Sequence, residues 1–470
     1  MPVVPFENGF ATGLSVLALL LAALSLSLPL SLPLSLPLSL PLSAAPPEYL
    51  ANEEIAPDRA SDVAAPLDGF ARETVAVPPG AFGEATGAYF PILEEILSEA
   101  TIELAPRTYY LRSSVGGQVR EEWAAGGNAS MLTGWWRDSL RIGLSGYTSQ
   151  ALATPHGRGS TGLLQPGGKG YWSLGEAYIE GKVGDLLSAK GFRQELTLPF
   201  FNRSDSRMTP KSHEAYIATA DLSPQLRIGG GHITRMKNRT SEDFLPLSEV
   251  AGAEGTNRGA TLAGIRYAWP DDAGSIGALY ARGWDTMDIF YAETSRHWDL
   301  PGDFDFNTSV QFARQSSTGD ELVGSFDTQS SGAQAALGFR SAVVTVACTT
   351  TDREADLRSP WGGTPLFNSV MISDFNRAGE DSWRAGLSYR FDRIGLSGVS
   401  AFANYVHGNT PDHGTAASPD EDEFDITVDL RPEKGVFRDW WLRVRHGWTD
   451  GHGGQQRKDL RIVLNCSIAF

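Results

Sequence analysis

Arginine side chains recur at alternate positions in several segments of this 470-residue chain. In WWLRVRHGW, residues 440–448, Arg443 and Arg445 are interleaved with Leu442 and Val444. The guanidinium group stays charged in proteins, and its planar fork can bind a carboxylate through two hydrogen bonds. Several such groups along a narrow aqueous passage would offset the cost of moving an anion out of bulk water. These residues therefore indicate electrostatic selection of a solute rather than covalent chemistry.

The arginines lie in segments with the two-residue period of a β-strand that has one apolar and one polar face. Three more segments share this pattern: WWRDSLRIGL at residues 135–144, SWRAGLSYRF at residues 382–391 and DLRIVLNCSIAF at residues 459–470. By this parity, the arginines that we expect to line a water-filled lumen are Arg137, Arg141, Arg384, Arg390, Arg443, Arg445 and Arg461.

Each of these arginines has a second interpretation, a salt bridge to a carboxylate on a neighbouring strand with no part in transport. The segment FDITVDLR, residues 424–431, carries Asp425 and Asp429 on its polar face. We expect these carboxylates to pair with Arg443 and Arg445 one strand away, because opposite charges that face each other across strands stabilise a sheet.

The repeated alternation predicts an all-β fold, and three features favour a transmembrane antiparallel barrel over a soluble sandwich. Paired arginines are costly to bury in a core but natural along an aqueous lumen. Aromatic residues stand at strand ends, where interfacial girdles belong. Connections are short at residues 431–437 and 390–398 but long at residues 348–381 and 406–423, as in outer-membrane barrels. At roughly 21 residues per strand and connection, the region after residue 95 holds about 18 strands, and 16 fits nearly as well.

The start of the chain predicts a targeting segment. Residues 13–28 form an apolar run that passes into a Pro-Leu-Ser repeat, and small residues near Ala44 and Ala45 suit cleavage. We expect residues 1–45 to be a signal peptide with a low-complexity leader, residues 46–90 a flexible leader, and residues 91–470 the barrel. A single membrane anchor is the alternative for the first segment. After it, no window approaches the ~20 apolar residues that a spanning helix needs.

Composition excludes several functions. The formal net charge of −17 argues against nucleic acid as a partner. The two cysteines, Cys348 and Cys466, are expected to be free thiols, with a single long-range disulfide as the alternative. No spacing predicts a metal site or a cofactor. The acidic run at residues 420–423 is read as a solvated loop tip rather than a calcium site.

Two stretches resemble the OprD-type outer-membrane porins. LEEILSEATIELAPRTYYLR, residues 93–112, resembles the first strand of that family. The stretch at residues 170–216 resembles the segment around its third loop, above all Arg193-Gln194-Glu195, Pro199-Phe200 and Asp205-Ser206-Arg207-Met208. The resemblance covers essentially everything after residue 90.

The resemblance implies a monomeric barrel of 18 strands in the outer membrane of a Gram-negative bacterium, with an inward-folded constriction loop. It implies passive, substrate-preferring diffusion of small hydrophilic solutes, usually carboxylate-bearing, past a ladder of arginines. Outer-membrane lipids and the barrel-assembly machinery would be its other partners. By resemblance Arg107, Arg112, Arg207 and Asp205 join the pore-lining set, with Arg207 and Asp205 near the constriction.

Three other classes remain as alternatives. The first is a barrel enzyme of the lipase or protease type, the second a structural barrel with a plugged lumen, and the third a soluble secreted β protein. The porin interpretation requires no catalytic residue, so the sequence predicts a protein that is not an enzyme.

Overall fold

A computed structural model of the chain describes residues 97, 99–155, 157–270, 273–451 and 454–469. Both predicted leader segments, and Phe470 at the end of the last strand, lie outside the described residues. Within the described part, no helix is both long and apolar enough to cross a membrane.

The described residues form a single antiparallel wall of long strands. Its members are β1 (Thr101–Val115), β2 (Gln118–Leu132), β3 (Leu140–Ala153), β4 (Tyr171–Val183), β5 (Leu187–Gln194), β8 (Ser212–Asp221), β9 (Leu226–Lys237), β11 (Ala260–Ala268), β12 (Gly274–Gly283), β13 (Met287–Leu300), β14 (Phe304–Ser317), β15 (Asp327–Phe339), β16 (Ala342–Thr351), β17 (Asp381–Arg390), β18 (Val399–Asn409), β19 (Glu421–Leu430), β20 (Trp440–Asp450) and β21 (Arg457–Cys466). The minor elements are β6 (Thr197–Leu198), β7 (Phe201–Asn202), β10 (Phe244–Pro246), α3 (Leu247–Val250), η4 (Phe391–Ile394) and β22 (Ile468–Ala469).

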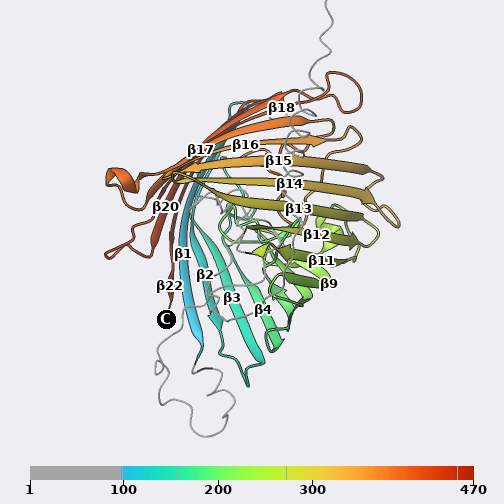
Figure 1. Cartoon of the computed structure of the whole chain (residues 1–470), viewed down its shortest axis with the longest axis vertical. Coiled ribbons are helices and arrows are strands. Elements are labelled where there is room, and N and C mark those ends of the chain that lie inside the picture. Colours follow the sequence, from blue (N-terminus) through green and yellow to red (C-terminus); the bar gives the residue numbers. More distant parts are fainter. Residues whose placement is uncertain (1–96, 98, 156, 271–272, 452–453, 470) are drawn as a thin grey trace, which may run out of the picture. The chain divides into compact units, whose positions relative to one another are not determined.

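Each wall strand pairs with its neighbour in the chain, and β21 pairs with β1 to close the barrel (Figure 1). The wall has 18 strands within the described residues, which settles the choice between 16 and 18. Closure matters because an open edge would leave unpaired backbone groups in the hydrocarbon of a membrane.

The two faces of the wall differ as the period of two predicts. On β16, Val344 and Val346 are 52% and 53% exposed on the outer face, whereas Val343, Ala347 and Thr349 on the other face are buried. An apolar outer face of this kind suits lipid. Cys348 and Cys466 are free thiols, as predicted.

Connections at the two ends of the barrel differ in length. At the end near the start of β1, the turns include residues 184–186, 222–225 and 340–341. At the other end, the long connections are residues 154–170, 195–211, 238–259 and 352–380. The same end also has one tight turn, in which Gly116 and Gly117 take φ values of 54° and 85° that glycine adopts without strain.

One long connection, residues 195–211, folds into the barrel. Its Met208 is buried in a cluster with Tyr109 and Leu111 of β1, although β1 is separated from β5 by three strands of the wall. The predicted inward-folded loop is therefore present.

Candidate functional site

A charged cluster occupies the tip of the inward loop. Arg107 of β1 donates to both carboxylate oxygens of Asp205, at 2.6 and 2.9 Å, and to the backbone carbonyl of Arg207 at 2.7 Å. Its Nε donates to Asn465 of β21 at 2.7 Å. The Arg107 guanidinium group thus ties the loop to the strands that close the barrel, and this bidentate arrangement is the strong form of an ion pair.

A second arginine approaches Asp205 from the loop itself. Arg203 Nη2 lies 3.0 Å from Asp205 Oδ2, and Arg203 Nε lies 3.4 Å from Glu195 Oε2. The other oxygen of Glu195 accepts a 2.6 Å hydrogen bond from Tyr147 of β3. Burial alone would raise the pKa of Asp205, but Arg107 and then Arg203 outweigh it and hold that pKa below its ordinary value.

Arg207 lies two residues beyond Asp205 and is partly exposed. Its Nε donates to the backbone carbonyl of Thr161 at 3.2 Å, and its Nη1 donates to the carbonyl of Ser206 at 2.7 Å. Both acceptors are neutral backbone carbonyls. Arg239, from the connection after β9, adds a guanidinium group that donates to Ser204 Oγ at 3.2 Å.

A second connection, residues 352–380, also folds inward, which the sequence pattern did not predict. Its Trp361 is fully buried and stacks on Phe201 of β7 with 5.1 Å between ring centroids. Asn202 and Gly363 exchange two hydrogen bonds of 2.7 and 3.1 Å. Lys211 also donates to Gly362 O at 3.0 Å. The two inward connections are therefore linked to each other.

The short hairpin of β6 and β7 that receives Trp361 carries backbone strain. Phe200 lies in the turn between β6 and β7 and has a φ of 64°. This conformation costs an L-residue about 1–2 kcal/mol. The ring of Phe200 is fully buried, with its centroid 6.1 Å from that of Tyr291 on β13. Apolar packing inside the barrel offsets the strain, so local sequence preferences do not predict this turn.

The second half of residues 352–380 is attached to the opposite wall. The buried carboxylate of Glu423 on β19 accepts hydrogen bonds from the amides of Ile372 and Ser373, each at 2.8 Å. Arg461 of β21 donates to the carbonyl of Met371 at 2.7 Å. Glu421 and Glu423 are almost fully buried, so the reading of residues 420–423 as a solvated loop tip was wrong.

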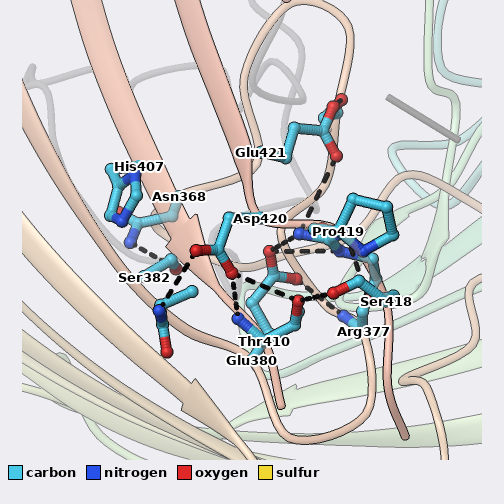
Figure 2. Close-up of polar contacts among 12 residues, drawn as sticks. Asn368, Arg377, Glu380, Ser382, His407, Thr410, Ser418, Pro419, Asp420 and Glu421 are labelled. Atoms are coloured by element: carbon cyan, nitrogen blue, oxygen red, sulfur yellow. Dashed lines mark hydrogen bonds and ion pairs between the residues drawn. The ribbon is translucent and has the colours of Figure 1, made fainter. Parts of the chain in front are cut away.

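The rim above this attachment is closed by a polar network (Figure 2). Arg377 donates to Glu380 at 2.6 Å and to the carbonyl of Pro419 at 2.7 Å. Asp420 accepts from the amide of Thr410 at 2.9 Å. These contacts join residues 352–380 to the next connection, residues 410–420, and hold the inward fold in place.

The arginines predicted from parity fall into three groups. Arg384, Arg443, Arg445 and Arg461 lie on the inner face of the wall. Arg443 forms the predicted pair with Asp429, through hydrogen bonds of 2.8 and 2.9 Å, and it is 3% exposed. Arg445 donates to Thr427 at 3.1 Å and interacts electrostatically with Asp425.

Arg141 and Arg390 lie near the turn-bearing end of the barrel. Arg141 forms an ion pair of 2.8 Å with Glu180 of β4. Arg390, the last residue of β17, lies 3.9 Å from Asp392, and its side chain is 39% exposed.

Two of the predicted lumen arginines need correction. Arg137 is not on a strand, because β3 begins at Leu140 and Arg137 and Asp138 form a turn with φ values of 50° and 55°. Arg112 is exposed on the outer face of β1, where the buried Leu111 and Ser113 on either side of it point inward. Neither arginine lines the interior.

Comparisons with known proteins agree with this architecture. Residues 94–470 match the model of a family described as outer membrane porin, OprD family. Porin D of Pseudomonas aeruginosa is 23% identical over 411 residues, covering 80% of this chain and 92% of that relative. A porin-like protein GalP of Pseudomonas putida is 20% identical over 360 residues, covering 74% and 87%.

Solved structures show the same fold. OccK9 (OpdG) of Pseudomonas aeruginosa superposes with a TM-score of 0.74 at 21% identity, covering 80% of this chain and all of that one. A BenF-like porin from Pseudomonas fluorescens superposes with a TM-score of 0.72 at 17% identity, with the same coverage of 80% and 100%. The closed barrel, its inward loop and the match over residues 94–470 lead to one conclusion: this chain belongs to the OprD family of porins, channels of the Gram-negative outer membrane.

Proposed function

We propose that this porin prefers small hydrophilic solutes that carry a carboxylate, and that the inward loop selects them. The observation that supports this is the concentration of guanidinium groups at that loop. Arg107, Arg203, Arg207 and Arg239 gather around the tip, where Asp205 and Glu195 supply fewer negative charges. In a protein of net charge −17, such a local excess of positive charge creates an attractive field for anions.

The arginines on the inner wall extend this proposal. Arg384 on β17, Arg443 and Arg445 on β20, and Arg461 on β21 would form the ladder that the resemblance implies. The Arg443–Asp429 pair is already neutral as a unit, so we assign selection to the loop cluster and a supporting role to the wall. One protein of the same fold, OpdK of Pseudomonas aeruginosa, was solved with vanillate, an aromatic carboxylate.

The proposal is tested by comparing two solutes of nearly the same size, gluconate and glucose, in proteoliposome uptake. We expect gluconate to enter faster, and Arg207→Ala to reduce its rate about fivefold while leaving glucose nearly unchanged. The estimate assumes that one guanidinium group contributes about 1 kcal/mol in a water-filled passage. Equal rates for the two solutes in the wild-type protein would refute the proposed preference.

A dependence on pH also follows from the loop. The side chain of Lys211 is buried where the loop meets Gly362. Burial, with Arg239 nearby, lowers the pKa of Lys211 to about 7. A depressed lysine pKa means that the ammonium group loses its proton as the pH rises through 7, so positive charge beside the constriction falls. Anion preference, measured from reversal potentials, should therefore be larger at pH 6 than at pH 8.

Lys211→Met provides the control for this pH effect, because it keeps the length of the side chain and removes the titrating group. We expect the variant to lose most of the change in selectivity that the wild-type protein shows between pH 6 and pH 8. A variant that kept the full change between pH 6 and pH 8 would show that another group is responsible.

A further inference from the structure

The outer surface of the barrel carries cations where β20, β21, β1 and β2 lie side by side. Arg112 of β1 and Lys458 of β21 are both exposed. Arg112 pairs with Glu121 on β2 and with Leu460 on β21. Two residues further along β1, Ser114 pairs with Lys458 on β21. The alternation of β1 and β21 therefore places both cations on the lipid-facing side.

Aromatic side chains fix the level of these cations along the barrel. Tyr110 and Trp123 face each other across β1 and β2, two residues closer to the middle of the wall than Arg112. Trp448 faces Lys458 across β20 and β21. Aromatic belts mark the boundary between hydrocarbon and headgroups. Arg112 and Lys458 thus lie at or beyond the belt, at the end with the long loops, which faces outward in such barrels.

A third cation joins them from the connection at residues 154–170. Arg158 Nη1 lies 3.2 Å from Glu121 Oε2, and the Arg158 side chain is 50% exposed. The other oxygen of Glu121 accepts from Tyr110 Oη at 2.8 Å. The phenol of Tyr110 lies within electrostatic range of both Arg112 and Arg158. Two of the cations, Arg112 and Arg158, therefore lie beside the Glu121 carboxylate, which is already engaged twice.

Other outer-face arginines at the same end are neutralised within the protein. Arg282 of β12 forms an ion pair of 2.8 Å with Asp288, and Arg314 of β14 forms one of 2.7 Å with Asp327. In contrast, neither Arg112 nor Lys458 forms an ion pair with any residue that the structure describes. The positive charge of this patch is therefore available to a partner outside the chain.

We propose that Arg112, Arg158 and Lys458 bind the phosphate groups of lipopolysaccharide in the outer leaflet. Guanidinium and ammonium groups form charge-assisted hydrogen bonds with phosphate oxygens. The apolar outer face of β1 and β21 continues directly below, beside Tyr110 and Trp123, where the acyl chains of the same lipid would lie. An acidic protein would otherwise repel a phosphorylated surface, so a local cationic patch provides the attachment.

The test measures binding of rough lipopolysaccharide to the detergent-purified protein by native mass spectrometry. We expect the wild-type protein to bind it, and the double variant Arg112→Ala/Lys458→Ala to bind about 25-fold more weakly, because each of the two surface cations contributes on the order of a fivefold change. The matched control, Arg282→Ala/Arg314→Ala, removes the same number of positive charges from the same end and should stay within about twofold of wild type.

Three results would overturn this proposal: equal affinity of the two double variants, equal binding of phosphatidylglycerol, or complete competition by inorganic phosphate at equal concentration. Single-channel conductance of both variants should equal that of wild type, which shows that the barrel is folded. Unchanged conductance also distinguishes lipid binding from solute preference, because the cationic patch and the inward loop lie on opposite faces of the wall.

Discussion

Asp205→Ala is expected to destabilise the protein by about 3–5 kcal/mol, the usual effect of removing one partner from a buried ion pair. The Asp205 carboxylate is 5% exposed and receives bonds from Arg107 and Arg203. Its removal leaves two guanidinium groups close together in a mostly buried position. We would measure the free energy of unfolding of the barrel in lipid vesicles from the change of tryptophan fluorescence with denaturant.

Asp299→Ala is the control for this substitution, because the Asp299 side chain is 94% exposed and its removal should change the unfolding free energy by less than about 0.5 kcal/mol. If Asp205→Ala were no more destabilising than the control, the loop tip would not be held by its charges. Neither Arg107 nor Arg203 would then determine the position of the loop.

Glu423→Ala is expected to release residues 352–380 from the inner wall. The fully buried Glu423 carboxylate accepts from two amides, those of Ile372 and Ser373, and each amide left unpaired costs about 1–3 kcal/mol. The freed segment should move within the lumen. We expect single-channel recordings to show larger current fluctuations and a changed conductance.

Glu433→Ala, at an exposed position in the turn between β19 and β20, makes the same substitution without touching the connection and serves as the control. If Glu423→Ala showed the same current fluctuations and conductance as the wild-type protein, the contacts of Met371 with Arg461 and of Asn202 with Gly363 would be enough to hold the segment. That result would contradict the anchoring role assigned to Glu423.

The sequence predicted the wall of this barrel well, because a strand with lipid on one side and polar groups on the other must alternate. The pairing of Arg443 with Asp429 could be predicted for the same reason, since register and parity set both partners on one face. The strand number could not be predicted by counting residues, because connection lengths vary. It is determined by the pairing of β21 with β1.

The failures have physical causes too. Arg107 and Arg112 are five residues apart, so they cannot share a face of one strand, and the resemblance alone grouped them together. Arg137 lies in a turn with positive φ values but no glycine, which the sequence pattern does not reveal. The inward course of residues 352–380 depends on distant contacts such as Trp361 with Phe201. Its Gly, Pro and acidic residues are equally typical of an exposed loop.

Guanidinium groups at the inward loop are expected to make the channel prefer anions. Reversal potentials across a planar bilayer, under a salt gradient, measure this preference directly. We predict anion preference for the wild-type protein, a clear loss of it in Arg207→Ala, and no change in Arg112→Ala, which removes the same charge from the outer face. Cation preference in the wild-type protein, or equal effects of the two substitutions, would contradict the claim.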